Sequence, residues 1–117
     1  MEELKGAAKL LRIFLCEADK LHHKPLCECI LEEARKTGLA GATSWKGIMG
    51  FGPTSRIRTS KIMDLSNDLP VIIEIIDEEA KINNFIPKLH DFFDQAKSGG
   101  MVTVERVEII RYLHGHP

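Results

Sequence analysis

Residues 69–77, with the sequence LPVIIEIID, constrain the fold of this chain more than any other stretch. Their length and β-branched side chains predict a strand, in which successive side chains point to opposite faces of a sheet. Apart from Glu74, apolar side chains fall on both faces: Val71, Ile73 and Ile75 on one, and Ile72 and Ile76 on the other. Both faces of this strand must therefore be covered by other protein.

Three further segments have the pattern of strands. They are residues 7–17, residues 41–51, where glycines would bend or bulge the strand, and residues 101–112. In the last segment the apolar alternation changes phase near Glu105 and Arg106. This change predicts a bulge there, or two short strands that meet.

Two segments have the three- and four-residue apolar spacing of helices. The first begins near residue 26 and has Gly38 as its expected stop. The second covers residues 82–96. Because Pro87 lies inside it and lacks an N–H group, we expect a kink or a late start near residues 83–84.

The order strand, helix, strand, strand, helix, strand predicts an α+β fold. The simplest arrangement is a ferredoxin-like double βαβ sandwich, an antiparallel four-stranded sheet with two helices on one face. The 117 residues leave room for a single domain, residues 1–117, with a flexible polar loop over about residues 53–68. Since two helices cover only one face, the two-sided strand predicts an oligomer.

Composition disfavours several functional classes. No apolar run approaches the roughly 20 residues of a membrane span. The acidic start (MEELK) has no signal-peptide pattern, so we expect a cytoplasmic protein. A formal net charge of -1 disfavours a general nucleic-acid binder. The spacing provides no Ser-His-Asp, Cys-His or paired-carboxylate arrangement, so an enzyme is disfavoured.

A glycine-rich stretch, residues 38–52 (GLAGATSWKGIMGFG), is the main functional candidate. Its backbone N–H groups fit an anion nest, or the stretch is a bulged strand before a hairpin. Residues 34–63 also contain several Lys and Arg but no Asp or Glu. Among them, Arg56, Arg58 and Lys61 fit a phosphate clamp or a solvated loop. Trp45 and Phe51 fit base stacking or core packing.

Cysteine and histidine residues carry weaker signals. Cys16, Cys27 and Cys29 are an odd number in a chain without an export signal, which predicts buried thiols rather than disulfides. Histidines stand in two pairs that could chelate a metal if the fold brought them together: His22 with His23, and His114 with His116. Their spacing does not require a metal, so none is expected.

Several segments together resemble the PII-like signalling proteins, and within them a branch known as a domain of unknown function. The resemblance is carried, in chain order, by residues 38–43 (GLAGAT), 50–52 (GFG), 68–77 (DLPVIIEIID) and 98–103 (SGGMVT). It implies the double βαβ fold, a homotrimer, and an adenine nucleotide held in clefts between adjacent subunits.

The resemblance also implies nucleotide-binding roles for particular residues. The segment that holds the adenine corresponds to Gly41, Ala42 and Thr43. The start of the flexible loop that faces the phosphates corresponds to Gly50, Phe51 and Gly52. Arg56 and Arg58, further along the loop, are nucleotide-binding candidates on their charge. A second phosphate loop corresponds to Gly99 and Gly100. Arg111 resembles a basic residue that reaches over from a neighbouring subunit.

One departure from the family pattern bears on the ligand. Where PII proteins place a lysine after the second phosphate loop, this chain has Met101, which favours AMP or ADP over ATP. The expected function is therefore a PII-like regulator that binds an adenine nucleotide and signals through residues 53–68 to a partner, such as a membrane transporter. Two alternatives stay open: a metal-responsive trimer like the CutA proteins, and a small enzyme acting on a phosphorylated metabolite.

Overall fold

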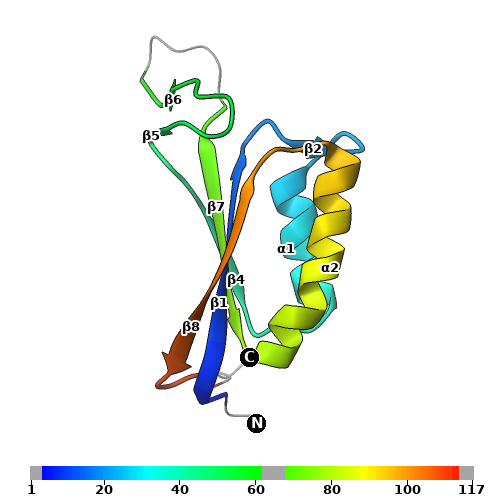
Figure 1. The fold of residues 1–117 in the computed structure, drawn as a ribbon, viewed down its shortest axis with the longest axis vertical. Coiled ribbons are helices and arrows are strands. Elements are labelled where there is room, and N and C mark those ends of the chain that lie inside the picture. The colour runs from blue at the N-terminus through cyan, green and yellow to red at the C-terminus, as the bar shows by residue number, and fades with distance from the viewer. Residues whose placement is uncertain (1–3, 62–67, 114–117) are drawn as a thin grey trace.

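The computed structural model describes residues 4–61 and 68–113. Four strands form one antiparallel sheet: β1 (Gly6–Cys16), β4 (Ala42–Lys46), β7 (Pro70–Asp77) and β8 (Met101–Ile109). Their order across the sheet is β4-β7-β1-β8. Two helices, α1 (Leu26–Lys36) and α2 (Glu79–Ala96), lie together on one face of the sheet (Figure 1). This arrangement confirms the predicted ferredoxin-like double βαβ sandwich.

The core lies between the sheet and the two helices. On β7, the side chains of Val71, Ile73 and Ile75 face the helices. They are paired across the ladder with Leu15, Ile13 and Leu11 of β1. These residues pack with the buried stripes of the helices, which are Leu26, Ile30 and Ala34 on α1 and Ile82, Phe85 and Leu89 on α2.

The helix ends agree with the sequence in part. Gly38 follows α1 with φ of +82°, and its N–H group donates to the carbonyl of Arg35, as predicted for a helix stop. The expected late start of α2 is wrong, because the helix begins at Glu79 and runs through Pro87. At its end, the residue in the left-handed conformation is Lys97, with φ of 53°, rather than a glycine.

The expected bulge in the last strand is also wrong. The β1–β8 register is continuous from Gly6 opposite Ile109 to Phe14 opposite Met101, and the strand ends at Ile109 rather than near residue 112. The phase change has another cause: this edge strand turns Val102 toward the helices at one end and Val107 away from them at the other.

The predicted second strand is divided at Gly47. The N–H group of Gly47 donates to the carbonyl of Pro70 at 2.8 Å, and the chain then leaves the sheet. The next strand, β5 (Met49–Gly50), pairs with β6 (Arg58–Thr59), which falls in the predicted loop. Figure 1 shows this β5–β6 hairpin beyond the end of the sheet at which β7 begins. Residues 62–67 of the loop lie outside the described residues.

A second small hairpin precedes α1. Strands β2 (Lys20–Leu21) and β3 (Lys24–Pro25) are joined by His22 and His23, which both have positive φ, 50° and 71°. Two consecutive residues with positive φ are typical of a type I′ turn, for which Asn-Gly is the usual sequence. The His-His pair therefore gave no turn signal in the sequence.

The second face of the sheet, which we call the helix-free face, has no helix against it in the described parts of the chain (Figure 1). Ile72 and Ile76 lie on it, as predicted for residues 69–77. Ile76 is 40% exposed, Trp45 50% and Met101 61%. The face thus leaves large apolar side chains in contact with solvent.

Candidate functional site

A cavity of about 440 Å³ lies where the β5–β6 hairpin meets the end of the sheet. We call it the hairpin cavity. It is lined by residues 14–16 of β1, 50–53 and 58 of the hairpin region, 70–72 of β7 and 99–101 at the start of β8. The cavity size is within the usual range for small-molecule sites. It brings together these predicted nucleotide-binding residues: Gly50, Phe51, Gly52, Arg58, Gly99, Gly100 and Met101.

The glycines of the hairpin cavity differ in what the fold requires of them. A Cβ atom on Gly100 would lie 2.6 Å from the carbonyl oxygen of Phe14, and one on Gly50 would lie 3.1 Å from Cγ of Pro70. Packing alone therefore requires glycine at Gly100. A Cβ atom on Gly52 would meet no atom within 4 Å, and its φ is negative, so the described fold permits a side chain there.

Arg58 is the cation of the hairpin cavity, and a carboxylate already neutralises it. Its guanidinium forms an ion pair with Asp68, and both side chains are mostly buried. Asp68 also accepts a hydrogen bond from the N–H group of Ala18 at 2.9 Å. Nearby, burial raises the pKa of the Cys16 thiol, and the positive charge of Arg58 opposes that shift. An anion that entered the cavity would compete with Asp68 for Arg58.

A second cavity, of about 710 Å³, lies at the other end of the helix-free face. We call it the tail cavity, because residues 107–112 line one side of it. Its other walls include residues 40–43, Leu10, Glu74 and Ile76. It brings together the remaining predicted residues except one: Gly41, Ala42, Thr43 and Arg111. Like Gly52, Gly41 has negative φ and open space around its Cα atom.

Two polar residues hold the walls of the tail cavity in place. Tyr112 donates a hydrogen bond from its hydroxyl to the carbonyl of Ala40. The carboxylate of Asp77, which is 1% exposed, accepts hydrogen bonds from the N–H groups of Ala40 at 2.9 Å and Glu78 at 2.7 Å. Sequence reasoning missed both residues. For Asp77 a signal existed, because it shares the buried face with Val71, Ile73 and Ile75.

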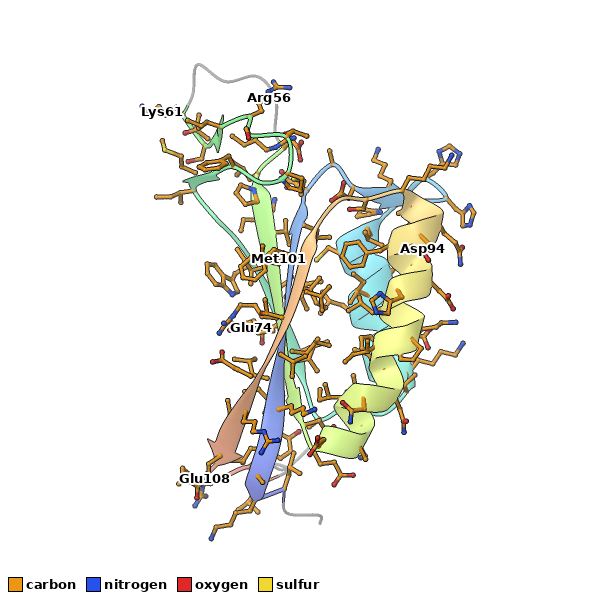
Figure 2. The ribbon with its side chains drawn as sticks, in the orientation of Figure 1. Arg56, Lys61, Glu74, Asp94, Met101 and Glu108 are labelled. Atoms are coloured by element: carbon orange, nitrogen blue, oxygen red, sulfur yellow. The ribbon has the colours of Figure 1, made fainter. Side chains whose placement is uncertain are left out.

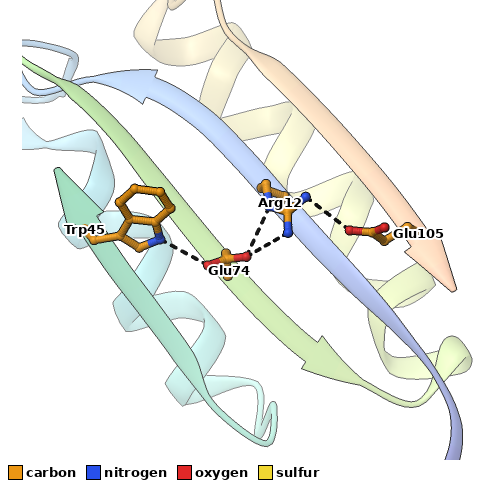
Figure 3. Close-up of polar contacts among 4 residues, drawn as sticks. All are labelled: Arg12, Trp45, Glu74 and Glu105. Atoms are coloured by element: carbon orange, nitrogen blue, oxygen red, sulfur yellow. Dashed lines mark hydrogen bonds and ion pairs between the residues drawn. The ribbon is translucent and has the colours of Figure 1, made fainter. Parts of the chain in front are cut away.

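A charged network separates the two cavities on the helix-free face (Figure 3). Arg12 donates to Glu74 at 2.9 and 3.1 Å and to Glu105 at 3.1 Å, and the indole N–H of Trp45 donates to Glu74 at 3.1 Å. The hydrogen bonds from Arg12 and Trp45 lower the pKa of Glu74, and the two glutamates raise the pKa of Arg12. Figure 2 shows Glu74 on the side of the sheet away from the helices.

Other predicted side chains fall outside these cavities or differ from expectation. Arg56 is exposed and lines neither cavity. The core interpretation of Trp45 and Phe51 is wrong, since they are 50% and 69% exposed. The three cysteines are free but half-buried rather than fully buried.

Residues 4–61 and 68–113 contain no group of three or more His, Cys, Asp or Glu side chains that could hold a metal ion. His114 and His116 lie outside these ranges. No helix in the described ranges is long and apolar enough to cross a bilayer.

A family model described as "DUF190: Uncharacterized ACR, COG1993" matches residues 8–109 of this chain. The chain belongs to the DUF190 family. A UPF0166 protein of Aquifex aeolicus (strain VF5) is 43% identical to the DUF190 protein described here, over 87% of this chain and 92% of the relative. A UPF0166 protein of Methanocaldococcus jannaschii is 37% identical over 83% and 86% of the two chains.

Solved structures resemble this DUF190 protein in fold. CPII from Thiomonas intermedia K12, solved bound to ADP and bicarbonate, is 21% identical, with 88% of each chain covered and a TM-score of 0.65. A PII-like signaling protein from Thermus thermophilus is 20% identical, with 94% of each chain covered and a TM-score of 0.63. The DUF190 protein therefore has the PII-like fold, as the sequence motifs predicted.

Proposed function

We propose that this DUF190 protein is a PII-like regulator that binds AMP or ADP in the clefts of a homotrimer. Each cleft would consist of the hairpin cavity of one subunit and the tail cavity of its neighbour. Residues 53–68 would signal occupancy to a regulated partner, for which a membrane transporter is the candidate. The protein would act in the cytoplasm, and it would bind the nucleotide without converting it.

The observation that carries this proposal is the division of the candidate contacts between two cavities. Gly41, Ala42, Thr43 and Arg111 line one cavity. The phosphate-loop candidates other than Arg56 line the other cavity, on the far side of the Arg12 network. A cyclic trimer has head-to-tail interfaces, in which one surface of a subunit meets a different surface of the next. Such an interface would bring unlike cavities together.

Exposed apolar side chains support the assembly. Trp45, Ile76 and Met101 lie on the helix-free face and are 40% or more exposed. Burying such side chains stabilises an assembly by roughly 25 cal/mol for each Å² of apolar surface removed from water. A subunit interface on this face would cover them.

Two glycines and one set of related structures support an adenine nucleotide. Neither packing nor φ requires a glycine at position 41 or 52. A ligand or a neighbouring subunit that approaches the main chain closely would explain why glycine is present there. CPII, which shares the fold, has been solved with ADP and AMP bound. Met101, in place of the lysine of PII proteins, lines the hairpin cavity and leaves it with fewer cations for a triphosphate.

Calorimetry and sedimentation test the proposal together. We expect a trimer that releases or absorbs heat with AMP or ADP, and more weakly with ATP. Gly52→Ala should weaken binding about tenfold or more at unchanged thermal stability, while the matched variant Lys81→Ala, on the exposed surface of α2, should bind like the wild type. A monomer, no heat with any adenylate, or turnover of the nucleotide would overturn the proposal.

A further inference from the structure

The β5–β6 hairpin exposes more apolar surface than a solvated loop requires. Ile48 is 77% exposed, Met49 51% and Ile57 62%. None of the three lines the hairpin cavity. All three belong to one hairpin: the carbonyl of Ile48 accepts a hydrogen bond from the N–H group of Ser60, Met49 stands opposite Thr59, and Ile57 directly precedes β6. Exposed apolar clusters of this kind mark contact surfaces.

Cations accompany these apolar side chains, and two described acids at the same end, Glu17 and Asp68, are already paired. Arg56 and Lys61 are exposed, and neither forms an ion pair within residues 4–61 and 68–113. Figure 2 shows both at the hairpin end of the molecule. At the same end, Glu17 is paired with Lys46, and Asp68 with Arg58. Among residues 4–61 and 68–113, the hairpin end therefore presents two cations, Arg56 and Lys61, that no described acid pairs with.

We propose that the hairpin tip, defined as Ile48, Met49, Arg56, Ile57 and Lys61, docks on an anionic membrane surface. Aliphatic side chains among cations match the boundary between acyl chains and anionic headgroups. The β5–β6 hairpin that carries the tip also lies beyond the end of the four-stranded sheet (Figure 1). A bilayer accepts a protruding wedge without a complementary shape, whereas an acidic protein would have to provide a matching pocket.

This inference goes beyond the nucleotide proposal and does not depend on it. The tip residues lie outside the hairpin cavity, and the test uses nucleotide-free protein. Failure to bind vesicles would leave nucleotide binding untouched, and failure to bind nucleotide would leave the vesicle result untouched.

Vesicle flotation tests the docking. Nucleotide-free protein should float with phosphatidylcholine vesicles that contain phosphatidylglycerol and not with phosphatidylcholine alone. Binding should fall at about 0.5 M salt, where surface charge is screened. The double variants Ile48→Ser/Ile57→Ser and Arg56→Glu/Lys61→Glu should each lose about tenfold or more in affinity. These side chains are exposed, so thermal unfolding should be unchanged.

A control variant places one change of each kind elsewhere. Val104→Ser/Lys81→Glu alters one exposed apolar and one exposed basic residue away from the hairpin and should bind like the wild type. Equal loss in this control, equal binding to neutral vesicles, or full binding by Ile48→Ser/Ile57→Ser would overturn the proposal. Binding to polyaspartate that is equally strong in the wild type and in Ile48→Ser/Ile57→Ser, together with no flotation on anionic vesicles, would assign the tip to an acidic protein instead.

Discussion

The hydroxyl of Tyr112 donates a hydrogen bond to the carbonyl of Ala40, which joins the segment after β8 to the segment before β4. These two strands are the opposite edges of the sheet. The bond therefore connects segments that no strand pairing connects, and it closes the tail cavity on one side.

Removal of this hydroxyl should loosen the tail cavity. Tyr112→Phe keeps the ring and loses the donor, so we expect the free energy of unfolding to fall by about 1 kcal/mol. Amide exchange should become faster in residues 40–43, because their neighbour is no longer held. If amide exchange became faster only in residues 109–113, the hydrogen bond would not position residues 40–43.

Asp77 should be far more sensitive to substitution than exposed acids. Asp77→Ala leaves the N–H groups of Ala40 and Glu78 without their acceptor in a buried place. We expect a loss of about 2–4 kcal/mol in the free energy of unfolding, measured by urea denaturation. Asp91→Ala, on the exposed side of α2, is the control and should change stability by less than about 0.5 kcal/mol. Similar losses in both variants would contradict this role.

Two adjacent glycines should respond differently to alanine. Gly100→Ala forces a Cβ atom to within 2.6 Å of the carbonyl oxygen of Phe14, which we expect to cost about 1–3 kcal/mol in stability. Gly99→Ala meets its first atom, Cγ of Pro53, at 3.5 Å and should leave thermal unfolding nearly unchanged. Gly99→Ala is therefore the cleaner probe of a phosphate loop. Equal destabilisation by both variants would show that the steric account is incomplete.

The Arg58–Asp68 ion pair should oppose anion binding in the hairpin cavity. Asp68→Asn keeps an oxygen that can accept from Ala18 but removes the charge that neutralises Arg58. We expect ADP affinity to rise by about threefold to tenfold in Asp68→Asn and to fall by about tenfold or more in Arg58→Ala, by calorimetry. Glu17→Gln alters an acid paired with Lys46 at the same end and is the control. If Asp68→Asn bound ADP with wild-type affinity, Asp68 would not compete with the nucleotide for Arg58.

Glu74 should contribute to acid sensitivity. Its pKa in the folded protein is lowered by hydrogen bonds from Arg12 and Trp45. The stabilisation is therefore complete above the unfolded pKa, about 4, and is lost as pH falls through the lowered folded value. In Glu74→Gln the free energy of unfolding should depend less steeply on pH below about 4. Some pH dependence of the free energy of unfolding should remain in this variant, because Lys9 also lowers the pKa of Glu79.

The emission of Trp45 gives a local readout of the same titration. Trp45 is the single tryptophan, and its indole donates to Glu74. Its fluorescence should change as pH falls below about 4 in the wild type and not in Glu74→Gln. Identical titrations in the two proteins would exclude Glu74 as the group responsible.

The main elements of the fold were predictable, because they depend on local apolar periodicity. The two-sided pattern of residues 69–77 and the stop at Gly38 were both confirmed. The errors arose where tertiary packing overrides local signals. Apolar burial at Ile82 supports the first turns of α2 despite Pro87, and β8 changes its buried face without a bulge.

Most of the predicted site residues line the two cavities, but the arrangement of the cavities was not predictable. Glycine motifs identified the stretches that line both cavities, yet periodicity cannot show that Gly41 and Gly52 lie at opposite ends of one face. The network of Arg12 joins residues more than sixty positions apart, and no short-range pattern contains it. The hairpin at His22 and His23 was missed because its turn lacks the usual glycine.

The last rung between β4 and β7 is the hydrogen bond from Gly47 to Pro70, and beyond it the hairpin backbone pairs with itself. We therefore expect insertions, deletions or foreign loops introduced after that rung to leave the register of the four sheet strands unchanged. The protein is thus suited to loop grafting, in which a new recognition segment is installed on an unaltered scaffold.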